Sequence, residues 1–161
     1  MVTTDDIWKF LEEVSDPEIP VLTIIDLGVV RSVQFDGTTC NVVITPTYSG
    51  CPAMQMIEDQ IKEKLTEKGI PSTKVELTLS PAWTTDWISE NGRNKLREYG
   101  IAPPENEVDK SVLFAEPPTV PCPLCGSSDT RMVSQFGSTA CKAQYQCNQC
   151  LEPFDYFKCL K

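Results

Sequence analysis

Four cysteines near the end of the chain have the spacing of a metal site. They form two pairs, Cys122-Pro123-Leu124-Cys125 and Cys147-Asn148-Gln149-Cys150. Two residues within each pair let one turn aim both thiolates at a single ion, and roughly twenty residues between the pairs suffice for the β-hairpins of a zinc ribbon. The chain has no histidine, so thiolates or carboxylates would hold the ion, and soft thiolates favour zinc or an iron–sulfur cluster. We expect structural zinc, with a cluster as the alternative, because four thiolates leave no coordination position for a substrate.

Two further cysteines, Cys141 and Cys159, lie in the same segment. Either could replace one of the four ligands or join a transient iron–sulfur site; the alternative is that both are thiols without a metal. Gly126 follows the first pair, where the turn needs a positive φ, whereas Leu151 follows the second. Such a short segment has too small a core to fold without a metal. Aromatic residues at its end would cover the metal or contact a partner: Phe154, Tyr156 and Phe157.

Cys51 is the candidate for thiol chemistry in the first part of the chain. It lies in a loop between a predicted strand and a predicted helix, and Pro52 suits the first helical position. At a helix N-terminus the dipole and the free N–H groups would favour the thiolate. Neighbouring hydroxyl groups, among them that of Thr47, can hydrogen-bond a thiolate or a bound anion. The alternative is a small buried thiol at a tight turn, which is also what we expect of Cys40 within its strand.

The elements that must position Cys51 follow from hydrophobic periodicity over residues 1–101. A first helix begins at Thr4 or Asp5, and Asp36-Gly37 is typical of a hairpin turn between two strands. The expected elements are a helix at 7–14, strands at 30–35 and 40–45, a helix at 54–65 ended by a glycine at 69, a half-buried strand at 75–79, and a helical region at 83–96 interrupted at 91–92. This order, α-β-β-α-β-α, predicts a small α+β domain with helices on a mixed three-stranded sheet.

The chain divides into two expected domains and a linker. Residues 1–101 form the α+β domain, and residues 122–161 form a zinc-ribbon-like β module. Residues 102–121 between them are rich in proline and charge, which is typical of a semi-extended linker.

Composition narrows the classes of partner and compartment. The 161 residues carry a net charge of −9, with 14 basic against 23 acidic residues. An acidic chain without clustered Lys and Arg is repelled by phosphate, so we expect no nucleic-acid partner. The sequence has no apolar run of about eighteen residues and no signal-peptide pattern at its start, so we expect no membrane span and a cytoplasmic location. Thiols stay reduced there, and paired cysteines indicate a metal rather than disulfides.

Three motifs in order resemble the metal–sulfur cluster biosynthesis family: Asp16-Pro17-Glu18, Asp26-Leu27-Gly28-Val29-Val30 and the loop from Thr45 to Pro52. These small α+β proteins assist iron–sulfur assembly or delivery. The resemblance implies that Cys51 is the reactive cysteine, with Asp16 and Glu18 as acidic residues near it. The residues themselves leave alternatives open: Asp16 could cap a turn, Glu18 could be a solvated acid, and Asp26 and Gly28 could serve a turn before the first strand.

Other segments extend the resemblance to a phenylacetate-degradation family in which such a domain is fused to a cysteine module. They are residues 79–87, 100–104, 136–142 and 152–159. This resemblance implies an accessory role beside the oxygenase and reductase components of a phenylacetyl-CoA epoxidase, and contact with the iron–sulfur assembly machinery.

The sequence favours an accessory protein over an enzyme. It contains neither the Glu-x-x-His pairs of a di-iron centre nor a G-x-G-x-x-G dinucleotide fingerprint. The leading hypothesis is a maturation factor in which Cys51 transiently holds iron or a cluster. The alternatives are a metal-stabilised binding subunit without metal transfer, and a thiol-dependent redox enzyme, which would need a resolving cysteine near Cys51.

Overall fold

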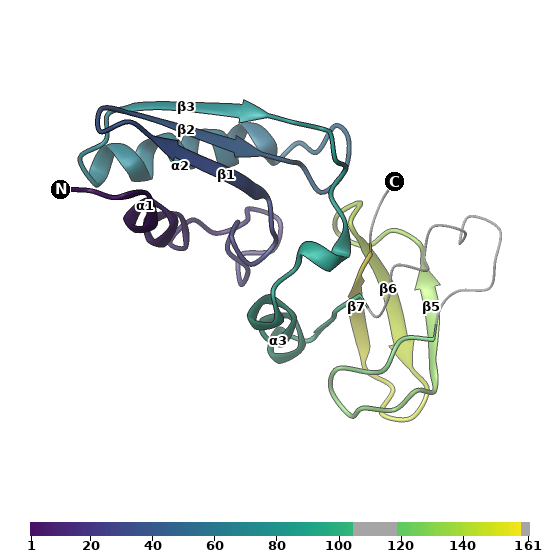
Figure 1. Ribbon diagram of the computed structural model, residues 1–161. Helices are drawn as coiled ribbons and strands as arrows, with labels where there is room; N and C mark the ends of the chain where they lie inside the picture. The colour runs from purple at the N-terminus through teal and green to yellow at the C-terminus, as the bar shows by residue number, and fades with distance from the viewer. Residues whose placement is uncertain (105–118, 159–161) are drawn as a thin grey trace. The chain divides into compact units, whose positions relative to one another are not determined.

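The computed structural model describes residues 1–104 and 119–158. It divides the chain into two units: residues 1–83 with 87–92, and residues 84–86 with 93–161. The elements in chain order are α1 (Thr4–Leu11), β1 (Val30–Phe35), β2 (Thr39–Ile44), α2 (Met54–Glu67), β3 (Ser72–Leu77), the 3-10 turn η1 (Thr85–Trp87), α3 (Glu90–Tyr99), β4 (Ile101–Ala102), β5 (Thr130–Ser134), β6 (Lys142–Cys147) and β7 (Pro153–Phe157) (Figure 1).

The first unit is built on a three-stranded sheet in the order β1-β2-β3. β1 is antiparallel to β2, and β3 is parallel to β2 because α2 connects them. α1 packs against β1, and α2 against β3. This confirms the predicted α+β class and the mixed three-stranded sheet. No helix in the described part of the chain is both long enough and apolar enough to span a bilayer.

Helix ends and faces in the first unit follow local rules. The N-cap of α1 is Thr3, one residue before the expected start, because its side chain and that of Asp6 form a reciprocal capping box. α2 buries one stripe on the sheet: Ile57, Ile61 and Leu65. Gly69 ends this helix with φ +89°, as predicted.

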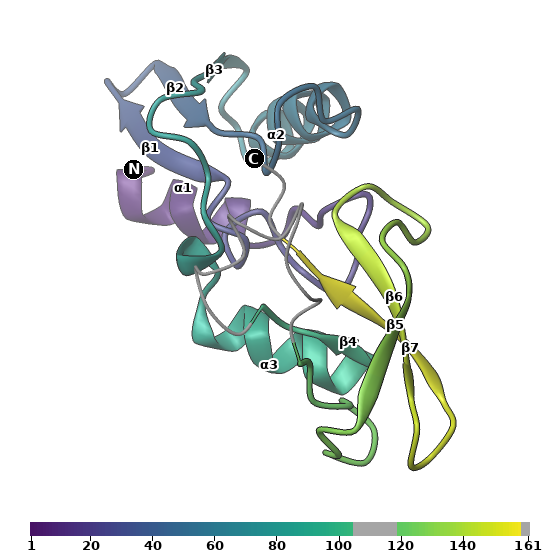
Figure 2. The same ribbon diagram turned by 90° about the vertical axis from the view of Figure 1, so that its right-hand side faces the viewer.

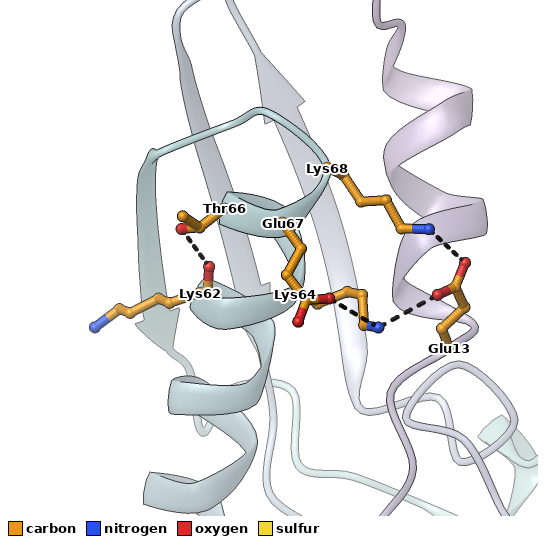
Figure 3. A network of polar contacts seen from close by, with 6 residues as sticks. All are labelled: Glu13, Lys62, Lys64, Thr66, Glu67 and Lys68. Carbon is orange, nitrogen blue, oxygen red and sulfur yellow. Dashed lines mark hydrogen bonds and ion pairs between the residues drawn. The ribbon is translucent and has the colours of Figure 1, made fainter.

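Ion pairs join the end of α2 to the residue that follows α1 (Figure 3). Glu13 accepts from Lys68 Nζ at 2.9 Å and from Lys64 Nζ at 3.3 Å. Hydrogen bonds from these two lysines lower the pKa of Glu13 below its usual value. Lys64 also lies 3.3 Å from Glu67. The pairs are partly exposed, so they orient the two helices more than they stabilise the fold.

Two expectations about the end of this unit were wrong. The strand predicted at 75–79 ends at Leu77, and Leu77 and Leu79 are 56 % and 57 % exposed instead of half-buried, because β3 lies at the edge of the sheet. Asn91-Gly92 does not interrupt a helix but lies within the first turn of α3. A Cβ on Gly92 would lie 3.1 Å from Asp26 Cβ, so this turn passes close to the segment before β1.

The Asp-Leu-Gly motif before β1 has a structural role. Asp26 is buried, and its carboxylate accepts from the Thr23 N–H, Ser89 Oγ and Asn91 Nδ2. Gly28 has φ +70°, and a Cβ there would lie only 2.5 Å from the Trp87 carbonyl oxygen. The motif thus serves the predicted turn and also holds residues 87–91 against the unit.

The second unit is a four-stranded sheet in the order β4-β7-β6-β5 (Figure 2). Its small core packs Tyr145 against Phe154 and Tyr156, with ring centroids 5.8 and 5.6 Å apart. The aromatic residues expected to cover a metal or contact a partner are therefore core residues, and Phe157 is also buried.

Both ends of the expected linker at 102–121 belong to this folded unit. Ala102 pairs with Tyr156 in the sheet, and Val120 is buried in the same core. The expected domain boundary at residue 101 falls inside β4, because that short strand adds to β7. Residues 105–118 of the expected linker lie outside the described part of the chain.

Candidate functional sites

The second unit brings the four paired cysteines together. Cys122 Sγ lies 3.8 Å from Cys150 Sγ, and Cys125 Sγ lies 3.6 Å from Cys147 Sγ. All four sulfur atoms lie within 4.8 Å of one another. Zinc–sulfur bonds of about 2.3 Å place neighbouring sulfurs of a tetrahedron about 3.8 Å apart. The four-cysteine cluster therefore has the dimensions of a tetrahedral thiolate site.

Two similar turns present these sulfur atoms. In the first, Gly126 has φ +78° and its N–H donates to the Cys122 carbonyl at 2.8 Å. In the second, Leu151 takes φ +67°, the left-handed conformation that was expected of a glycine there. Both turns thus have the same backbone form, although only one carries the residue that adopts it without strain.

Backbone N–H groups from these turns point at the sulfur atoms. The Cys150 N–H donates to Cys147 Sγ at 3.4 Å, and this bond is the main cause that lowers the pKa of Cys147 to about 7. Cys150 accepts from the Glu152 N–H, but burial and the neighbouring thiols raise its pKa to about 12. Cys125 accepts from the Ser127 N–H. Such donors satisfy thiolates, so the cluster fits a cation held by four sulfurs.

The two remaining cysteines of the segment do not enlarge this cluster within the described residues. Cys141 is buried, and its sulfur lies 3.1 Å from Thr139 Oγ1. It is not among the residues whose ligand atoms meet. Cys159, the other candidate for an additional ligand, lies outside the described residues.

Cys51 lies just before α2, but not where a helix dipole acts most strongly. α2 begins at Met54 with Ala53 as its N-cap, so Pro52 precedes the helix instead of opening it. The Ala53 N–H donates to the Cys51 sulfur, as does the Tyr48 hydroxyl. Tyr48 therefore supplies the hydroxyl that touches the thiol, a role for which Thr47 was the candidate in the sequence.

The structure places Asp16 and Glu18 close enough to Cys51 to act on its titration. Burial raises the pKa of the Cys51 thiol, and the charges of Glu18 and Asp16 raise it further, outweighing the two hydrogen bonds. The expected thiolate is therefore wrong for the free protein, because the helix-end donors are opposed by desolvation and by two carboxylates. What the fold provides is a protonated thiol beside two acids.

Asp16 is held in place by the backbone. It is buried, and its Oδ1 accepts from the Glu18 and Ile19 N–H groups, each at 2.8 Å. The turn that it caps carries Glu18, so one residue both shapes the loop and contributes charge near the thiol. Cys40, in contrast, is fully buried in β2 and has a pKa raised by burial, as expected of a core thiol.

Comparison with known proteins gives the same division of the chain. Residues 4–77 match the model of an iron–sulfur cluster assembly protein family. Residues 106–158 match that of the PaaD zinc β-ribbon domain. A domain of unknown function from Bacillus anthracis, solved by crystallography, shares the fold with a TM-score of 0.55 and 25 % identity, over 58 % of this chain and 90 % of that one.

Two relatives link the parts to named proteins. An Fe-S protein maturation auxiliary factor from Porphyromonas gingivalis is 37 % identical over 97 residues, covering 58 % of this chain and 90 % of that protein. A protein from Escherichia coli, named as one of the subunits of 1,2-phenylacetyl-CoA epoxidase, is 52 % identical over 155 residues, covering 96 % of this chain and 92 % of that protein. The chain therefore belongs to the PaaD family of phenylacetyl-CoA epoxidase subunits, which joins an iron–sulfur cluster assembly domain to a zinc β-ribbon.

Proposed function

We propose that this protein is a maturation factor that assists iron or iron–sulfur cluster assembly for a phenylacetyl-CoA epoxidase. The observation that carries the proposal is the thiol of Cys51 beside Asp16 and Glu18, in a domain of the iron–sulfur assembly family. A binding role alone does not require a partly buried thiol with two acids around it. The clients would be the oxygenase and reductase components, with cargo from the iron–sulfur assembly machinery.

The raised pKa of Cys51 gives this site a simple loading cycle. At neutral pH the empty site holds a thiol, because burial and the two carboxylates disfavour a third negative charge. An arriving iron ion reverses this balance, since its positive charge is attracted by Asp16 and Glu18 and favours the thiolate. The sulfur then binds iron and its proton leaves to water. Transfer to a client reverses the step, so the empty site does not remain as a reactive thiolate.

The second unit would act as a folded docking module and not as a second reactive site. Its four sulfurs fit zinc, and a closed four-thiolate site supplies folding energy without an open coordination position. Neither unit then carries out the epoxidation, so the protein is an accessory subunit and not an enzyme.

The test is replacement of Cys51 by Ser, with Ser49→Ala in the same loop as the matched control. In cells grown on phenylacetate, we expect Cys51→Ser to lower the iron and sulfide content of the epoxidase components and the epoxidase activity by about tenfold or more, as for loss of a metal ligand. Ser49→Ala should leave both unchanged. Unchanged occupancy in Cys51→Ser would contradict the proposed role of this thiol.

The competing function is a binding subunit that transfers no metal. It is favoured by the closed geometry of the four-cysteine cluster. In that case Cys51→Ser is silent, whereas Cys122→Ser abolishes co-purification with the oxygenase. Measuring complex formation and iron content in the same two variants separates the two functions.

A further inference from the structure

The strand β3 has an unpaired outer edge. Among the strands that the structure describes, it pairs with β2 alone, and it lies outermost in the sheet (Figure 1). Its register with β2 runs without a bulge from Ser72 to Leu77. The other edge strand, β1, is irregular between Val30 and Ser32. Bulges protect sheet edges from pairing with other chains, so β3 is the edge that remains open to another strand.

The side chains along this edge carry complementary charges. Lys74 and Glu76 are exposed and point to the same face, since they are two residues apart. No ion pair found in the described part of the chain involves either residue. On the opposite face, Thr73 and Val75 are partly buried, while Leu77 is 56 % exposed at the end of the strand. The edge thus combines unused charge with uncovered apolar surface.

We propose that a second copy of this chain pairs with β3 in antiparallel orientation, about a two-fold axis at Val75. This register sets Val75 opposite its own copy and Lys74 opposite Glu76 of the second copy, twice by symmetry. On the other face, Leu77 lies opposite Thr73 of the second copy, which covers part of its exposed side chain. The two sheets become one continuous six-stranded sheet.

The charge pattern also selects this register over its neighbours. A shift by two residues in one direction sets Lys74 opposite Lys74, and a shift in the other direction sets Glu76 opposite Glu76; like charges directly opposite are destabilising. A shift by one residue moves side chains to the wrong face. Only the register centred on Val75 keeps both faces aligned and pairs opposite charges.

The experiment measures mass against concentration by analytical ultracentrifugation of the full, metal-loaded chain. Each chain carries a net charge of −9, so the measurement is made at about 0.15 M salt, where repulsion beyond about 8 Å is screened. We expect the wild type to pass from monomer to dimer over about a thousandfold range of concentration, as mass action requires.

Charge-reversal variants test the register. Lys74→Glu sets two carboxylates opposite two carboxylates, and Glu76→Lys sets lysines opposite lysines, so each variant alone should remain monomeric. An equimolar mixture of the two should form a heterodimer, and the double swap should restore the homodimer. Lys9→Glu and Glu12→Lys, which make the same charge changes on and beside α1, are the matched controls and should dimerise as the wild type does.

Each other outcome overturns the proposal. A wild type that stays monomeric across the range shows that β3 does not accept a second copy. Dimers that persist in both single variants, or a mixture that fails to associate, show that copies meet through another surface. Circular dichroism of every variant confirms that the exposed substitutions leave the fold intact.

Discussion

The two units of the chain reach stability by different means. The first buries aliphatic side chains of two helices on a sheet, such as Ile61 and Leu65, which are fully buried. The second buries a small aromatic core and brings four sulfur atoms within 4.8 Å of one another. Burial stabilises in proportion to area, so a small sheet depends on its metal site where a larger α+β unit does not. The contrast teaches that the two kinds of cysteine in this chain answer different needs.

The units also differ in charge. The first holds six Lys or Arg against fourteen Asp or Glu, whereas the second holds eight against nine. Nearly all of the negative charge therefore belongs to the unit that contains Cys51. An acidic surface attracts cations, which agrees with iron as the cargo of that unit and not of the second.

The largest expected effect separates the units by metal removal. Cys147→Ser, or a chelator added to the wild type, should remove the metal and unfold the second unit, since structural zinc contributes on the order of 10 kcal/mol to folding. The first unit should stay folded. All three tryptophans, Trp8, Trp83 and Trp87, belong to that unit, so tryptophan fluorescence reports on it alone, while metal content and circular dichroism report the loss.

The matched control for this prediction is Cys141→Ser. This sulfur lies beside Thr139 and outside the four-cysteine cluster, so the variant should keep its metal. A tryptophan signal that is lost together with the metal in Cys147→Ser would mean that the two units do not fold independently.

A smaller effect tests the backbone of the first unit. Gly28→Ala should destabilise it by about 2–5 kcal/mol, because the added Cβ combines a left-handed conformation with overlap of the Trp87 backbone. Gly69→Ala has a similar φ and open space around it, so it should cost only about 1 kcal/mol. Guanidinium unfolding followed by tryptophan fluorescence measures both, and equal losses would contradict the packing argument.

The smallest effect concerns the two turns of the four-cysteine cluster. Leu151→Gly should stabilise the metal-bound second unit by about 0.5–1 kcal/mol, because it removes the strain of a leucine at φ +67°. Gly126→Ala should destabilise by a similar amount. The chelator concentration at half release of the metal should shift severalfold, upward in the first variant and downward in the second. A downward shift for Leu151→Gly would show that this side chain supports the turn.

Much of the fold could be predicted because its signals are local. The stripe Ile57, Ile61 and Leu65 predicted α2, and Gly69 predicted its end, since both depend on neighbouring residues along one helix. The Cys-x-x-Cys pairs predicted the four-cysteine cluster for the same reason: one turn fixes each pair.

Expectations failed where distant segments decide. Leu77 alternates as a core residue would, yet it is exposed because β3 lies at the sheet edge. Asn91-Gly92 looks like a break in a helix, yet it fits α3 because Gly92 lies against Asp26. The expected linker begins with Ala102, which pairs with a strand more than fifty residues later.

The sequence by itself determined which thiols this protein has, how they are paired, and that Asp16, Glu18 and Cys51 belong to one kind of site. Only the tertiary structure decided their states. It gathers four sulfur atoms around one point, and it sets two carboxylates near Cys51 so that the free thiol keeps its proton. The physical reason is that spacing is a property of the chain, whereas burial and charge interactions depend on residues that only folding brings together.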